Sequence, residues 1–200
     1  MTALYISGAV ALGLLSIPLM VYILNHLPDR AFCDYGETPT EHHRPPRVTS
    51  KQAVAAGLFL AVVFVLLFVR FGFSLHWLLL CLHCIALTMI SLSDLRFSII
   101  PDELLIGAGV CAGVYGVIHC VTAPSWSTVT FYLLGALLGA ALIFVLNLLG
   151  RLIYGQDALG MGDLKLLAVC GLACGPSGIL IAALIGIFCA GFFFCGSYRL

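Results

Sequence analysis

Hydrophobic residues in this chain fall into long runs separated by short polar stretches. Most runs approach the roughly 20 residues that an α-helix needs to cross about 30 Å of hydrocarbon. Seven such segments can be drawn, at residues 3–26, 52–69, 74–93, 103–121, 128–149, 163–175 and 177–196. The pattern predicts an all-α fold: a polytopic membrane helical bundle of about seven transmembrane segments.

The sixth segment differs from the others in length. Its roughly 13 residues would span only about 20 Å as a helix, before Gly175 and Pro176 interrupt it. A helix that is too short to cross the bilayer needs its ends to face protein or a water-filled cavity. Asp163 stands at one of these ends, so we expect this carboxylate to face a polar site.

Composition supports a membrane protein. Hydrophobic residues make up 62% of the 200 residues and charged residues only 9%, whereas a water-soluble domain carries about 25% charged residues. The length predicts a single membrane-embedded domain over residues 1–200. The net charge of zero gives no argument for nucleic acid as a partner. No Lys or Arg precedes the first apolar run, so we expect a first transmembrane helix and no removable signal peptide.

Basic residues predict the orientation of the chain. With seven crossings, the loops at 27–51, 94–102 and 150–162 and the C-terminal tail share one side of the membrane. Eight of the nine basic residues lie on that side: Arg30, Arg44, Arg47, Lys51, Arg96, Arg151, Lys165 and Arg199. The positive-inside rule makes this side cytoplasmic and places the N-terminus outside.

The same topology brings two aspartates to one face of the membrane. Asp94 closes the third segment on the cytoplasmic side, and the chain returns to this side at Asp163 after two further crossings. Two neighbouring carboxylates hold a single proton, so that one can take a proton from water while the other polarises a carbonyl. Gly160 and Gly162 precede Asp163 and would allow close backbone approach by an extended peptide.

Simpler roles for these residues stay open from the residues alone. Asp163 could cap a helix N-terminus, and Asp94 could pair with Arg96 at the interface. Asp102 and Glu103 follow Pro101, which is typical of a helix start.

Three stretches resemble the type IV prepilin peptidases, a family of intramembrane aspartic proteases. Segment three ends in Asp94, a basic residue and then Ile-Pro-Asp at 100–102. Residues 155–168, Gly-Gln-Asp-Ala-Leu-Gly-Met-Gly-Asp-Leu-Lys-Leu-Leu-Ala, are similar to the second motif almost position for position. The first helix ends Asn-His-Leu-Pro at 25–28, which is similar to the end of the family's first helix with looser spacing.

The resemblance implies a function and a site. The catalytic residues would be Asp94 and Asp163, cleaving the basic leader from type IV prepilins or pseudopilins in the bacterial inner membrane. Supporting or substrate-binding residues would be Gly160, Gly162, Lys165, Pro101, Asp102 and Asp157. Water would be the nucleophile, so we expect no metal and no organic cofactor. The expected partners are the prepilin or pseudopilin substrates and membrane lipid.

Two departures from the family pattern qualify this expectation. Many members carry paired Cys-x-x-Cys motifs in a large first cytoplasmic domain, whereas the loop at 27–51 is short and contains Cys33 alone. This argues against a zinc site and against N-methyltransferase activity. Relatives also continue into a further helix beyond the position of Leu200. The chain is therefore expected to be either a short member of the family or one whose bundle a homo-oligomer or a partner subunit completes.

Three other functions remain open on sequence grounds. A presenilin-type or signal-peptide-peptidase-type protease shares Gly-x-Gly-Asp, but it normally has Tyr before its other aspartate, where this chain has Ser93. A small ion-coupled or proton-coupled transporter would hold its acidic residues near the midplane. An inactive assembly scaffold is the third alternative.

Three further sets of residues are expected to have structural roles. Gly135, Gly139 and Ala140 suit close helix–helix approach. His76 and His83 share a helix face, where an interhelical hydrogen bond is expected in preference to a metal ion. Cys81 and Cys84, beside His83, are expected to pack as small apolar residues.

Overall fold

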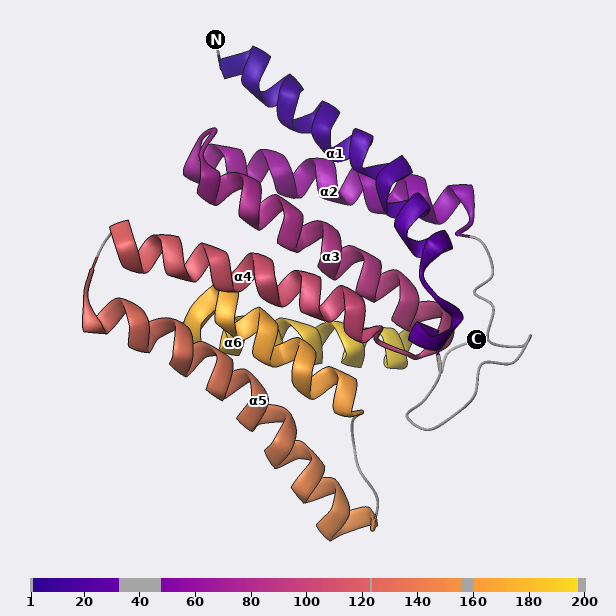
Figure 1. The fold of residues 1–200 in the computed structure, drawn as a ribbon. Coiled ribbons are helices and arrows are strands. Elements are labelled where there is room, and N and C mark those ends of the chain that lie inside the picture. Colours follow the sequence, from indigo (N-terminus) through magenta and orange to yellow (C-terminus); the bar gives the residue numbers. More distant parts are fainter. Residues whose placement is uncertain (1, 33–47, 123, 156–159, 198–200) are drawn as a thin grey trace. The chain divides into compact units, whose positions relative to one another are not determined.

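The computed structural model describes residues 2–32, 48–122, 124–155 and 160–197. The described part of the chain is helical and contains no strand. Its elements are α1 (Thr2–His26), the short 3-10 helix η1 (Asp29–Phe32), α2 (Ser50–Phe71), α3 (Leu75–Phe97), α4 (Asp102–Thr122), α5 (Trp126–Tyr154) and α6 (Met161–Ser197) (Figure 1). Six of these helices are long and apolar enough to cross a membrane. The all-α membrane fold is confirmed, and the chain is a multi-pass membrane protein.

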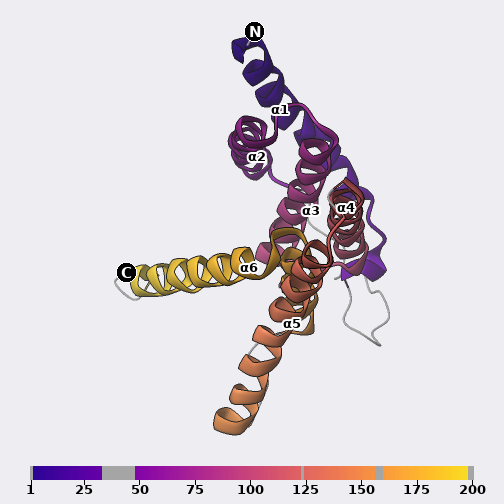
Figure 2. The same ribbon diagram turned by 90° about the vertical axis from the view of Figure 1, so that its left-hand side faces the viewer.

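The sixth and seventh expected segments are two limbs of one element, α6. The break that the sequence predicts is present, because Gly175 has φ +70° and ψ −178°, outside the helical region, and Pro176 follows it. The limbs run in different directions from this bend (Figures 1 and 2). A Cβ atom at Gly175 would collide with the ring of Phe131, so both the backbone and the packing require glycine there.

The chain divides into two compact units, residues 1–115 and residues 116–200. In the first unit, α1 and α2 pack closely through small residues. A Cβ at Gly13 would meet the backbone of Ala61 at 2.5 Å, and a Cβ at Gly57 would collide with the side chain of Ile17. This close approach is the usual way for membrane helices to gain van der Waals contact.

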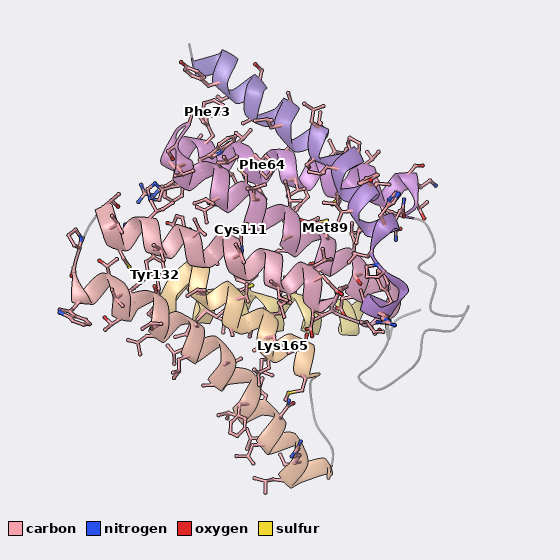
Figure 3. The ribbon with its side chains drawn as sticks, viewed as in Figure 1. Phe64, Phe73, Met89, Cys111, Tyr132 and Lys165 are labelled. Atoms are coloured by element: carbon pink, nitrogen blue, oxygen red, sulfur yellow. The ribbon has the colours of Figure 1, made fainter. Side chains whose placement is uncertain are left out.

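Aromatic side chains pack where α2 turns into α3. Phe73 lies edge-on to Trp77, with ring centroids 4.8 Å apart, and the indole N–H of Trp77 donates to the carbonyl of Phe64 at 3.1 Å. The Ser74 hydroxyl accepts the Trp77 backbone N–H at 3.2 Å and caps α3. Figure 3 labels Phe64 and Phe73 in this cluster. The cluster fixes one end of α3, the helix that carries Asp94.

A buried hydrogen bond joins α3 to α4 further along. The ring nitrogen Nδ1 of His83 lies 3.0 Å from the carbonyl oxygen of Ala108, and because a carbonyl can only accept, the ring N–H donates. His83 is 4% exposed. The expected interhelical hydrogen bond is therefore confirmed for His83.

In the second unit, α5 and the first limb of α6 approach each other backbone to backbone. A Cβ at Gly135 would collide with the carbonyl of Gly171, and a Cβ at Gly139 would collide with the carbonyl of Leu167. The two glycines of α5 are four residues apart and so occupy one helix face. The prediction that Gly135 and Gly139 allow close packing is confirmed. This contact fixes the limb of α6 that begins beside Asp163.

Candidate active site

Asp94 lies in the last turn of α3, four residues before the C-cap residue Ser98. The helix continues to Phe97 and stops at Ser98, whose φ of 53° and ψ of 31° are left-handed. The Ser98 backbone N–H donates to the carbonyl of Asp94 at 2.8 Å. The prediction that segment three ends at residue 93 is therefore wrong by one helical turn. The apolar run ends there, whereas the backbone hydrogen bonds of the helix continue to Phe97.

The corner between α3 and α4 is short and well bonded. The Ser93 hydroxyl donates to the carbonyl of Ile99 at 3.0 Å, and Ser93 and Pro101 are both buried. The Leu105 backbone N–H donates to the carbonyl of Pro101 at 3.2 Å, which closes the first turn of α4. The corner thus brings Asp94 and Pro101 into one tightly turned segment.

Asp102 and Glu103 form the first turn of α4, as the sequence predicts. Carboxylates are favoured at this position because the helix dipole is positive there. Asp102 is half-buried and Glu103 is exposed. Leu104 and Leu105 are buried and anchor the turn, so the acidic residues are held near the Asp94 corner.

Asp163 lies at the start of α6 and is half-buried. Met161 is the first helical residue, so Gly160 occupies the N-cap position and Asp163 the third position of the helix. The Asp163 Oδ2 atom accepts the Gly160 backbone N–H at 3.2 Å. This is the half of a capping box in which an acidic side chain reaches back to the N-cap, so the expected capping role is present.

Besides Asp163, the candidate residues of the second motif that lie in α6 are Gly162 and Lys165. Lys165 is half-buried on the first limb, where Figure 3 labels it. Residues two apart on a helix do not face each other, so Lys165 and Asp163 project from different sides. Gly162, directly before Asp163, is half-buried. Asp157 lies outside the described residues.

The two aspartates belong to different units, Asp94 to the first and Asp163 to the second. The structure thus brings together Asp94 with Pro101 and Asp102, and separately Gly160 with Gly162 and Asp163. Within each unit the aspartate is held at a helix end by backbone hydrogen bonds. That the two aspartates share one site stays a prediction.

The described residues contain no group of three or more His, Cys, Asp or Glu side chains placed to hold a metal ion. The cysteines with described side chains are free thiols: Cys81, Cys84, Cys111, Cys120, Cys170, Cys174 and Cys189. Cys33 lies outside the described residues.

Residues 81–195, more than half of the chain, match the type IV leader peptidase family. The chain belongs to this family. The matched region contains Asp94, Asp102, Asp163 and Lys165 and both glycines before Asp163, so the resemblance drawn from the sequence motifs is confirmed.

Three curated relatives of the family share sequence with the chain, each called a prepilin leader peptidase/N-methyltransferase. Two, from Burkholderia pseudomallei strains 1026b and K96243, are 30% identical over 173 residues, which cover 83% of this chain and 50% of the relative. The third, from Xanthomonas campestris pv. campestris, is 32% identical over 122 residues, covering 58% of this chain and 40% of the relative. The chain spans about half the length of the curated relatives it matches. No solved structure matches the chain.

Proposed function

We propose that this type IV leader peptidase family member is a membrane-embedded aspartic endopeptidase. Its substrates are type IV prepilins or pseudopilins, from which it removes the basic leader in the bacterial inner membrane. The observation that carries the proposal is the family match over residues 81–195, which includes both Asp94 and Asp163. The names of the curated relatives give the substrate class.

The chemistry needs only two carboxylates and water. A pair of adjacent carboxyl groups holds one proton, so its ionised member can accept a proton from water while its protonated member polarises the scissile carbonyl. In this proposal Asp94 and Asp163 are the two members. No covalent intermediate forms, and no cofactor takes part.

Helix lengths support a common membrane face for the two aspartates. Between them lie α4, with 21 residues, and α5, with 29 residues. At about 1.5 Å per residue these helices are about 32 and 44 Å long, so each can cross about 30 Å of hydrocarbon. Two crossings return the chain to its starting face, and the bias of basic residues makes this face cytoplasmic.

The packing around Gly160 supports close approach by a substrate. Among the described residues, a Cβ at Gly160 would meet the Asp163 Oδ2 atom at 3.6 Å and the Gly162 nitrogen at 3.9 Å, both ordinary contacts. Gly160 is also absent from the glycines with positive φ. Neither the packing nor the backbone conformation of the unit therefore requires glycine here, whereas an extended peptide lying against the start of α6 would.

Acidic side chains near the Asp94 corner suit a basic leader. Asp102 and Glu103 begin α4 and lie on the face that the topology assigns to the cytoplasm.

We propose cleavage alone and not N-methylation, because the loop at 27–51 is short. A transporter with midplane acidic residues fits less well, since both aspartates lie at helix ends.

The proposal is tested by leader cleavage in membranes that contain the full chain. Wild-type protein should convert a prepilin to its mature form, whereas Asp94→Asn and Asp163→Asn variants, inserted at equal levels, should leave it intact. Cleavage by either variant at the wild-type rate would remove that aspartate from the site. An inert wild type, tried on several prepilins and pseudopilins, would overturn the function.

A further inference from the structure

Ser93 makes a hydrogen bond unlike those of its neighbours in α3. The hydroxyls of Thr88 and Ser91 bond backward within the helix, to the carbonyls of Cys84 at 2.8 Å and Leu87 at 2.9 Å. The Ser93 hydroxyl instead reaches forward past the end of the helix, to the carbonyl of Ile99 at 3.0 Å. Ser93 is also only 2% exposed, whereas Ser91 is exposed.

The chain turns sharply at the point that this hydrogen bond spans. Ser98 has φ 53°, and it is the only non-glycine in the described part of the chain with a positive φ. A side chain at positive φ is strained, so such a turn persists only where surrounding contacts hold it. Two hydrogen bonds hold it here, from Ser93 to Ile99 and from Ser98 to Asp94.

These two bonds enclose the backbone of Asp94. Ser93, directly before Asp94, donates to the carbonyl of Ile99, and the Asp94 carbonyl accepts the Ser98 backbone N–H. On the far side of the turn, Pro101 is buried and its carbonyl accepts the Leu105 N–H. The Ser93 hydroxyl is therefore one of the contacts that fix the last turn of α3 relative to the first turn of α4.

We propose that Ser93 is a positioning residue for Asp94, which it serves by fixing the corner between α3 and α4. The inference rests on the proposed function, because it assigns Asp94 a catalytic role. Ser93 does not touch the substrate. Its hydroxyl keeps the Asp94 carboxylate and the start of α4, with Asp102, in one relative arrangement during turnover.

The test uses the purified full chain with a prepilin substrate and three variants. Ser93→Ala removes the tie, and Ser91→Ala removes an ordinary backward hydrogen bond two residues away. The double variant Ser93→Ala/Ser98→Gly removes the tie and also relieves the strain of the left-handed turn, so it should fold even where Ser93→Ala accumulates poorly. Two readouts are measured: kcat and KM for cleavage, and hydrogen exchange of the Ser98 amide.

Positioning predicts that Ser93→Ala lowers kcat about tenfold to a hundredfold, the scale of a small misplacement of a catalytic group, with little change in KM. Ser98 should exchange faster in this variant. The double variant should regain thermal stability and keep the low kcat, while Ser91→Ala should match wild type in both readouts.

Two results would overturn the inference. One is a wild-type kcat in Ser93→Ala. The other is a double variant whose kcat recovers together with its stability, since the role of Ser93 would then be stability alone. A wild-type protein that cleaves no prepilin would instead overturn the proposed function. The exchange of Ser98 would still show whether Ser93 holds the corner.

Discussion

The Oδ2 atom of Asp163 accepts the backbone N–H of Gly160 at 3.2 Å. The carboxylate therefore has a structural task at the start of α6, independent of any chemistry. The capping role and the proposed catalytic role are compatible, because a carboxylate has two oxygens and four acceptor sites. The two roles must be separated in experiments on this residue.

Asp163→Asn and Asp163→Ala separate capping from catalysis. Asn keeps an oxygen that can accept the Gly160 N–H, whereas Ala leaves that N–H without its partner. We expect both variants to lose cleavage by about 10²–10⁴-fold, the usual contribution of an acid–base group. We expect only Ala to lose the cap, at a cost of about 0.5–2 kcal/mol. Cleavage rates and thermal unfolding in detergent measure the two effects, and an Asn variant with more than a tenth of wild-type activity would contradict the catalytic role.

The contact between α5 and α6 should depend on glycine at position 171. A Cβ there would collide with the carbonyl of Gly135, so Gly171→Ala should destabilise the second unit by about 1–3 kcal/mol, as overpacking does. The loss of cleavage should follow, because this contact holds the limb that carries Asp163.

Gly186→Ala is the matched control for this variant. It lies on the second limb of α6, where a Cβ would meet no atom of the described residues within 4 Å. Alanine should be neutral there or stabilising by up to about 1 kcal/mol. Equal melting temperatures for the two variants would show that the backbone contact is not required.

Gly160→Ala should leave the fold intact and weaken substrate binding. A Cβ at this position makes only ordinary contacts, so the stability should fall by about 1 kcal/mol or less. If the substrate backbone lies against the start of α6, the added methyl should raise KM for prepilin. Gly107→Ala, at an open position on α4, serves as the control. An unchanged KM in Gly160→Ala would place the substrate elsewhere.

Reversing the charges of Asp102 and Glu103 should weaken binding of a basic leader. The double variant Asp102→Lys/Glu103→Lys should raise KM more than the neutral Asn/Gln pair does, and high salt should reduce the difference by screening exposed charges. The control is a prepilin whose leader lysines and arginines are replaced by glutamine. If the rise in KM is the same for both substrates, the acidic residues stabilise α4 and do not bind the leader.

Hydrophobic patterning predicts most of the helices in this chain. The first, second and fourth segments agree with α1, α2 and α4 to within two residues at each end. The bend at Gly175 and the glycines of α5 could also be predicted, since each depends on residues with a single plausible structural use. The family could be identified because its two motifs are short and specific.

Hydrophobic patterning fails where helices extend beyond the apolar run. The helix α3 continues to Phe97 and α5 to Tyr154, because backbone hydrogen bonds persist into polar sequence after the apolar face has ended. The left-handed Ser98 gives no sequence signal, since glycine usually ends a helix in this way. The hydrogen bond of Ser93 cannot be predicted from the sequence either, because its acceptor is a backbone carbonyl in the turn.

A cysteine pair at positions 94 and 163 tests whether Asp94 and Asp163 form one site. Asp94→Cys and Asp163→Cys are placed in a chain whose native cysteines are replaced, and disulfide formation under mild oxidation is measured by mass spectrometry. A disulfide needs Cβ atoms within about 4.5 Å, so a short thiol-to-thiol cross-linker is used in parallel. The control pairs Asp94→Cys with Ser125→Cys, at the other end of α5. If the two aspartates share a site, the cysteines at 94 and 163 should cross-link efficiently and those at 94 and 125 should not. No cross-link between 94 and 163, or an equal yield for the two pairs, would contradict a shared site.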